Sequence, residues 1–381
     1  MSRPWIPAAI LAVFATIGIL WANLDGHGYH DLWHHRFAMP LGLLTVDLDL
    51  HGWVNDALMT LFFLGAGVEI KRELVRGELR SPKAAALPVL AALGGMVTPI
   101  AIYLFGAMSF EGNRDGWAVP VATDVAFALG VLALAGPRVP VHLKLFLLTL
   151  AIADDVGGIL IIATVFTHSL SWGALAAGGA CIIAIFVMRM LRFDHPLAYV
   201  PICALMWYFT LQSGIHATIA GVVAGLLVPG APMRGVDVIE RVDKGLRPIV
   251  TFVVFPLFAV ANTGVEFHDG VVSGAATSNV FWGIFLGLLL GKCLGITLFT
   301  RLAVGLGLGV LPHGVSLRHV PAIGMLGGIG FTVSIFIADL SFADQLQLGQ
   351  AKLAILIAST LASFAGLALL LRTQTTSEAT P

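Results

Sequence analysis

Four charged residues lie inside long apolar stretches of this sequence, where charge is costly. Asp154 and Asp155 are adjacent in AIADDVGGI, Lys292 lies in LLLGKCLGIT, and Asp124 follows Thr123 in WAVPVATDVAFALG. Neighbouring residues on a helix point about 100° apart, so both aspartates can border one cavity without sharing a face. Two carboxylates this close cannot both carry charge cheaply in a low dielectric. The pair is therefore suited to bind either a proton or a small hard cation that prefers oxygen ligands.

A buried lysine needs an anionic partner or must lose its proton. The obvious partner for Lys292 is Asp154 or Asp155, and the stretch 281–290 before the lysine carries no charge. If the pair forms, a cation binding to the carboxylate would break it and release a proton from the lysine. A purely structural ion pair would not explain three carboxylates and a lysine at mid-span. No His or Cys lies nearby at the spacing of a zinc site.

The composition is that of a membrane protein. Of the 381 residues, 58% are hydrophobic and only 11% are charged, whereas a soluble domain averages about 25% charged residues. The net charge is -1 and no basic patch suggests a nucleic-acid partner. Cys181, Cys203 and Cys293 all lie in apolar runs, which favours buried thiols over disulfides. We expect a transporter in the lipid bilayer rather than an enzyme, and no cofactor.

The apolar stretches predict twelve membrane-spanning helices, since about 20 residues cross the hydrocarbon core. They cover residues 6–24, 54–74, 84–105, 117–135, 145–166, 172–188, 198–212, 215–228, 248–265, 280–300, 320–338 and 351–371. With both termini in the cytoplasm, the 21 lysines and arginines fall on the inner side except Arg36, Arg114, Lys352 and mid-span Lys292. We therefore predict an all-α membrane protein with one transmembrane domain over residues 1–372 and a disordered tail over 373–381.

Two spans contain residues that weaken a helix at depth. The fourth has Pro120, and the eleventh, VPAIGMLGGIGFTVSIF, has clustered glycines. Irregular backbone in a bilayer is tolerated only beside protein or a water-filled cavity. Breaks at corresponding positions of two halves predict inverted-topology repeats over about 84–166 and 280–371, with two broken helices that cross. The alternative is that the glycines only allow close helix packing.

If the helices are broken, their ends carry partial charges that the buried side chains would balance. We expect Asp124 beside the positive N-terminal ends of half-helices and Lys292 beside the negative C-terminal ends.

One external segment is predicted as strand. LLTVDLDL over residues 43–50 alternates apolar and polar side chains, and glycines flank it. We expect a small β-hairpin over residues 40–52 outside the membrane. Its exposed edge could pair with a second copy and give a homodimer, or the hairpin could simply cap the bundle.

The chain resembles the NhaA family of sodium/proton antiporters over nearly its whole length. The matching stretches are NDALMTLFFLGAGVEIKREL, WAVPVATDVAFALGVLAL, LTLAIADDVGGI, SGIHATIAGV, LFAVANTGV, GKCLGI and GGIGFTVSIFIA. The resemblance implies that Asp154 and Asp155 carry the ion and the proton, with Asp155 as the main Na+ ligand and Asp154 as the partner of Lys292. By the same resemblance, Thr123 and Asp124 lie where the broken helices cross and belong to the same ion- and proton-binding site. It also implies electrogenic exchange of Na+ or Li+ for H+ by alternating access in the bacterial inner membrane, activation at alkaline pH, and a dimer formed through the hairpin.

The regulatory positions depart from those of enteric family members. Glu69, Lys71 and Glu73 match a cytoplasmic funnel that the resemblance links to pH sensing. A second cluster before the ninth span has Asp243 and Arg247, with Lys244 between them, where enteric members have a glutamate and two histidines. Without those titratable histidines, the pH range of activation is expected to differ.

Two alternative functions are a symporter and a hydrolase. A sodium-coupled symporter of similar architecture would carry an organic anion, but it needs anion-binding groups beyond Lys292. An intramembrane hydrolase needs two carboxylates that meet across helices, whereas Asp154 and Asp155 are adjacent on one helix, and the sequence has no HExxH motif. Both fit the sequence less well than an antiporter.

Overall fold

A computed structural model describes residues 5–41, 44–109, 113–136, 139–167, 170–191, 193, 196–232, 236–267 and 270–378. The chain forms two compact units, each built from separate stretches of sequence. Unit 1 contains Met1–Asn23, Glu78–Gly158 and Thr263–Pro381, and unit 2 contains Leu24–Gly77 and Ile159–Asn262. This division into two units does not test the predicted single transmembrane domain over residues 1–372, which stays a prediction.

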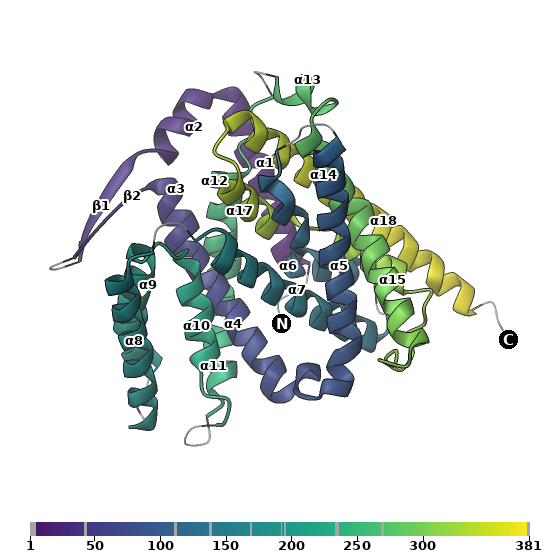
Figure 1. Cartoon of the computed structure of the whole chain (residues 1–381), viewed down its shortest axis with the longest axis horizontal. Coiled ribbons are helices and arrows are strands. Elements are labelled where there is room, and N and C mark those ends of the chain that lie inside the picture. The colour runs from purple at the N-terminus through teal and green to yellow at the C-terminus, as the bar shows by residue number, and fades with distance from the viewer. Residues whose placement is uncertain are drawn as a thin grey trace. The chain divides into compact units, whose positions relative to one another are not determined.

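Unit 1 is helical (Figure 1). Its elements are α1 (Ile6–Leu24), the 3-10 turn η2 (Glu78–Arg80), α5 (Pro82–Ser109), the 3-10 helix η3 (Asp115–Val121), α6 (Val125–Leu134), most of α7 (Val141–Val165), α13 (Val271–Ala275), α14 (Asn279–Leu286), the π-helix η6 (Gly287–Gly291), α15 (Lys292–Gly305), α16 (Val320–Gly327), α17 (Phe331–Ser341) and α18 (Gln345–Glu378). Helices α5 and α15 lie side by side because glycines meet at their contact: a Cβ atom at Gly295 would lie only 2.0 Å from the Gly94 carbonyl oxygen.

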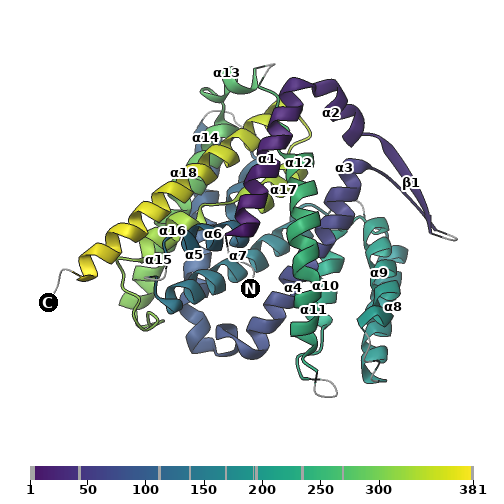
Figure 2. The same ribbon diagram turned by 180° about the vertical axis from the view of Figure 1, so that it is seen from behind.

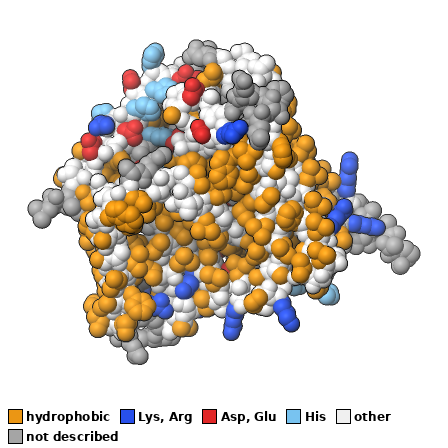
Figure 3. All heavy atoms as spheres, in the orientation of Figure 1, with side chains coloured by type: hydrophobic (Ala, Val, Ile, Leu, Met, Phe, Trp, Pro, Cys, Tyr) orange, Lys and Arg blue, Asp and Glu red, His pale blue; other side chains and the backbone are white. Residues whose placement is uncertain are grey.

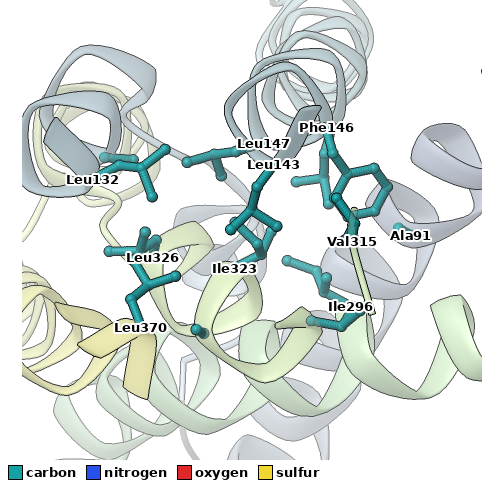
Figure 4. Packing of buried hydrophobic residues seen from close by; sticks show 14 of the residues in the cluster. Ala91, Leu132, Leu143, Phe146, Leu147, Ile296, Val315, Ile323, Leu326 and Leu370 are labelled. Carbon is teal, nitrogen blue, oxygen red and sulfur yellow. The ribbon is translucent and has the colours of Figure 1, made fainter. Parts of the chain in front are cut away.

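A close-packed apolar cluster forms the core of unit 1 (Figure 4). Side chains from six helices meet there, and most are fully buried. They include Ala91 of α5, Leu132 of α6, Phe146 and Leu147 of α7, Ile296 of α15, Ile323 and Leu326 of α16, and Leu370 of α18. This packing fixes α7 and α15, the two helices that carry the central charges, in one rigid body.

Unit 2 holds the remaining helices and the only sheet in the part of the chain that the structure describes. Helix α8 lies beside α9 in it (Figure 2). Its elements are α2 (Gly26–Trp33), β1 (Arg36–Leu41), β2 (Leu44–Asp49), α3 (Leu50–Gly52), the π-helix η1 (Trp53–Leu58), α4 (Met59–Arg76), α8 (Trp172–Met190), the 3-10 turn η4 (Pro196–Tyr199), α9 (Val200–Gln212), α10 (Thr218–Leu227), α11 (Val238–Ile249), the π-helix η5 (Val250–Val254) and α12 (Phe255–Asn262).

The small sheet is the predicted hairpin with shifted bounds. Strands β1 and β2 pair antiparallel, with Arg36 opposite Asp49 and Met39 opposite Val46. The first strand includes RFAMP, which lacks alternation and was not expected to be strand. Residues 50–52 are helical instead, because the Asp49 side chain accepts a hydrogen bond from Gly52 N and so caps α3. Residues 42–43 of the predicted hairpin lie outside the described residues.

The helices have the length and apolarity of a membrane protein. Among the described residues, nine helices are long and apolar enough to span a bilayer, and the bent pair α16–α17 makes a tenth. The predicted seventh and eighth spans correspond to shorter apolar helices, Leu197–Gln212 and Thr218–Leu227. Large apolar side chains stay exposed on the spanning helices, such as Ile183 of α8 and Leu294 of α15, and they cover much of the face in Figure 3.

Two of the predicted spans contain internal residues that are not helical. Residues 122–124 separate η3 from α6, and residues 328–330 separate α16 from α17, with a bend of 45° between the latter two helices. Pro120 lies in the last turn of the short 3-10 helix η3, and Gly328 and Gly330 lie between α16 and α17. At the chain end, α18 continues to Glu378, and residues 379–381 of the predicted disordered tail lie outside the described part, so that disorder stays a prediction.

Candidate functional site

The centre of unit 1 is an ion pair between α7 and α15. Lys292 Nζ donates to Asp154 Oδ2 and, at 3.1 Å, to Thr123 Oγ1. Both charged side chains are 0% exposed. An ion pair that is removed from water needs further hydrogen bonds to offset its lost hydration, and Thr123 supplies one. The structure therefore confirms the predicted partner of Lys292 and selects Asp154.

The hydroxyl of Thr123 has two acceptors for one proton. Its Oγ1 lies 2.6 Å from Asp154 Oδ2 and 2.8 Å from the carbonyl oxygen of Gly327. A hydroxyl has a single proton to donate, so it serves the carboxylate or the carbonyl at any moment. Gly327 is the last residue of α16, and its carbonyl is at the negative end of that helix. Thr123 thus links the ion pair to the break between α16 and α17.

One carboxylate oxygen of Asp154 is available to a further ligand. Its Oδ1 atom is buried and has no hydrogen-bond partner among the described residues. A buried acceptor without a partner costs free energy unless a ligand, proton or water satisfies it. Asp155 is half-buried on the next position of α7, and its charge acts on Lys292. A proton or a cation with oxygen ligands fits this pair of carboxylates.

Asp124 contacts the first turns of α6 and α17. It accepts hydrogen bonds from Phe127 N at 2.9 Å, and from Thr332 N at 3.2 Å and Thr332 Oγ1 at 2.6 Å. These donors are in the first turns of α6 and α17, where the helix ends carry partial positive charge. In addition, Asp124 N donates to Ile329 O at 2.6 Å. The carboxylate therefore lies at two helix N-termini, as the sequence predicted.

A π-helix directly precedes the lysine. Residues Gly287–Gly291 form η6, and Lys292 begins α15. Single π-turns widen a helix and are frequent at functional sites. The sequence of the apolar stretch 281–290 does not predict a π-helix, because the extra residue in the turn depends on packing against neighbouring helices.

The sequence did not predict two features of unit 1. The first is the contact of Thr332 with Asp124, for which the available signal was a polar residue two positions after the clustered glycines. The second is an ion pair between α17 and α18, where Lys352 Nζ lies 3.6 Å from Asp339 Oδ1. Their side chains are 10% and 17% exposed. Lys352 is at the start of the predicted span 351–371, but the structure buries it.

The candidates for pH sensing lie in unit 2, and the structure brings only some of them together. Arg72 and Arg247 both donate to Asp243 Oδ2, at 2.9 Å and 2.8 Å. Glu69 is close enough for its charge to act on all three. Lys71 lies apart, with its side chain beside Gly230. The side chain of Glu73 extends over Gly77, at the end of α4.

A neighbouring contact holds a carboxylate ionised at the surface of the same unit. Arg76 donates to Asp237, the residue that caps α11. This hydrogen bond keeps the pKa of the Asp237 carboxyl below its usual range. Asp237 therefore stays charged across neutral and alkaline pH and is not itself a sensor there.

Comparison with known proteins points to one family over nearly the whole chain. The family described as Na+/H+ antiporter 1 matches residues 2–370. An Na(+)/H(+) antiporter NhaA from Citrobacter koseri is 43% identical over 364 residues, which cover 94% of this chain and 93% of the relative. The protein of that name from Salmonella typhimurium is 43% identical over 361 residues, with the same coverage, and the one from Enterobacter sp. is 44% identical over 344 residues, covering 90% and 88%.

Proposed function

The chain belongs to the Na+/H+ antiporter 1 family, and we propose that it exchanges Na+ for H+ across a bacterial inner membrane. The observation that carries this proposal is the buried Asp154–Lys292 pair with a carboxylate oxygen that no described residue satisfies. The names of its relatives agree with it.

In this proposal Asp155 and Asp154 bind the ion. Na+ entering between the carboxylates takes oxygen ligands from both, and the unpartnered Asp154 Oδ1 is one of them. The positive charge of Na+ weakens the hold of Asp154 on Lys292, because one carboxylate cannot balance two cations equally well in a low dielectric. Lys292 can then lose its proton, so binding Na+ releases protons and binding protons releases Na+.

Thr123 and Asp124 support the exchange without carrying the ion. When Lys292 leaves Asp154, Thr123 can still donate to either the carboxylate or Gly327 O. Asp124 balances the positive ends of α6 and α17 while the charge nearby changes. These contacts favour a site that keeps its geometry in both ion-loaded and proton-loaded states.

The wider architecture belongs to the same proposal. We propose twelve spans, with both termini cytoplasmic, and inverted repeats over about 84–166 and 280–371 that work by alternating access. In support, unit 1 combines 78–158 with 263–381, which contain the two interrupted spans. Transport of Li+ and electrogenic exchange follow from the family resemblance, as does a homodimer through β1 and β2.

Regulation by pH is proposed for the cluster on α4 and α11. Glu69 is the carboxylate proposed to change its charge state, because it lies close enough to Arg72, Asp243 and Arg247 for that change to act on all three. Arginine does not titrate in the physiological range. A glutamate in this setting would therefore set the response, and Glu69→Gln should flatten the activation of transport by alkaline pH.

The test uses everted membrane vesicles acidified by respiration, with a dye that reports interior pH. Addition of Na+ or Li+ at about pH 8.5, where free carboxylates are ionised, should make the interior more alkaline, and K+ should not. Asp155→Asn should abolish the response, while the exposed-site control Asp344→Asn should keep it. No response from folded protein between about pH 7 and pH 9 would reject the antiporter. Uptake of a labelled organic anion would then favour the symporter.

A second measurement tests whether Na+ and protons compete for one site. If Na+ and protons share the carboxylates, mass action raises the Na+ concentration for half-maximal rate by up to about tenfold per unit fall in pH. A half-saturation that stays constant over the same pH range would contradict a shared site.

A further inference from the structure

The second buried ion pair, Asp339–Lys352, has no part in the exchange described above. Lys352 is nearly as inaccessible as Lys292, with 10% of its side chain exposed. A charged lysine inside a membrane protein is costly and marks either function or a necessary structural contact. The position of the pair, at the far end of a helix that contacts the ion site, suggests what it does.

Helix α17 is joined to α18 at two points. At its start, Phe331 N donates to Ser359 Oγ at 3.3 Å, and near its end Asp339 meets Lys352. Along α17 these points are about 12 Å apart, and along α18 about 10 Å, at 1.5 Å per residue. The order of the partners is reversed, so the two helices are antiparallel and are held in one axial register.

Helix α18 is itself fixed near Lys352. Gln350 Oε1 accepts from Ser278 Oγ at 2.6 Å, and Gln347 Oε1 accepts from Asn113 Nδ2 at 2.7 Å. These contacts tie the first turns of α18 to the start of α14 and to the segment before η3. A lysine on α18 can therefore hold α17 against a fixed support.

The register of α17 decides a contact at the ion site. Thr332, in its first turn, donates its N–H and its hydroxyl proton to Asp124 Oδ2. The break at residues 328–330 means that no continuous helix transmits the position of α16 to α17. The position of Thr332 then depends on contacts of α17 itself. These include the hydrogen bond from Ser334 Oγ to Val119 O at 2.9 Å and the charged contact Asp339–Lys352 with α18.

We infer that Asp339 and Lys352 are positioning residues for ion exchange, which hold Thr332 on Asp124 by fixing α17 along α18. This inference rests on the proposed antiport. Loss of the pair lets α17 shift along its axis, which loosens the carboxylate at the break and weakens Na+ binding a helix length away. The effect is on the affinity for Na+ rather than on the coupling of Na+ to protons.

The experiment measures Na+-dependent alkalinisation in everted vesicles for Lys352→Met, Asp339→Asn and the double variant. Each single variant should raise the Na+ concentration for half-maximal rate by about threefold or more, and the double variant should add little, because the two residues share one contact. Lys352→Arg should restore the wild-type value. Asp344→Asn is the matched control, since the exposed Asp344 lies in the same segment and only caps α18.

A second background tests the route through Thr332. In a Thr332→Val protein, which lacks the hydroxyl contact to Asp124, Lys352→Met should no longer change the half-saturation. If the effects of the two substitutions instead multiply, the pair does not act through Thr332 and the inference is wrong.

Other outcomes overturn the inference just as clearly. Lower amounts of folded protein and a lower maximal rate, with unchanged half-saturation, would mean that the pair is only structural. A changed ratio of protons to Na+, measured from the reversal potential in proteoliposomes, would mean that Lys352 carries a proton itself. Wild-type vesicles without any Na+ response would instead reject the proposed function.

Discussion

Within its described residues, unit 1 contains two lysine–aspartate pairs with a buried lysine, and their difference shows what separates an ion site from an ion pair. Asp154 and Lys292 are 0% exposed and sit at the interrupted helices, with a shared hydroxyl and a second carboxylate beside them. Asp339 and Lys352 lie 3.6 Å apart near the end of α17, at 17% and 10% exposure. Burial of a lysine is common to both. The distinguishing features are the unpartnered Asp154 oxygen, the adjacent Asp155 and the two acceptors of Thr123.

The largest effect is expected from removing the lysine of the first pair. Lys292→Met leaves the buried Asp154 charge without its partner, which should lower the free energy of unfolding by about 3–5 kcal/mol and abolish exchange. Thermal unfolding in detergent and the vesicle assay measure the two effects. The double variant with Asp154→Asn removes both charges, so it should recover much of the stability without recovering transport. Active Lys292→Met protein would remove the lysine from the mechanism.

An intermediate effect is expected at Thr123, whose hydroxyl bridges Lys292 and Asp154 in the first pair. Thr123→Val keeps the shape but leaves Lys292 and Asp154 with one hydrogen bond fewer, at a cost of about 1–3 kcal/mol in stability. The rate of exchange should fall as well, because the bridge to Gly327 O is lost. Thr123→Ser retains the hydroxyl and should behave like wild type. Equal loss in both variants would point to packing of the methyl group instead.

The smallest effect is expected for an exposed ion pair, which serves as the baseline for the two buried pairs. Lys244 and Glu240 form an exposed pair on α11, 2.9 Å apart, with side chains 73% and 54% exposed. Such surface pairs contribute about 0–1 kcal/mol. Lys244→Gln should therefore change neither the unfolding temperature nor the Na+ half-saturation measurably. A clear shift in the pH dependence of transport would instead make Lys244 part of the regulatory cluster.

Much of the site could be predicted from the sequence because a bilayer makes charge conspicuous. Asp124, Asp154, Asp155 and Lys292 stand out in a chain with 11% charged residues. The rule that such groups are paired predicted that Lys292 meets one of the two adjacent aspartates. The bend between α16 and α17 lies at the glycines of the eleventh span. The count of twelve spans stays a prediction, because two of the predicted spans are short apolar helices that fall below the length that identifies a span by composition.

The sequence by itself determined the class of protein, the helical spans and the list of central charges, since these depend on local composition and on the cost of charge in hydrocarbon. Tertiary structure decided which carboxylate pairs with which lysine, and it selected Asp154 for Lys292 and Asp339 for Lys352. The burial of Lys352 could not be read from LGQAKLAIL, where the lysine lies close to a polar stretch. It arises because α17 returns antiparallel along α18 and brings a carboxylate from 13 residues earlier in the chain against it.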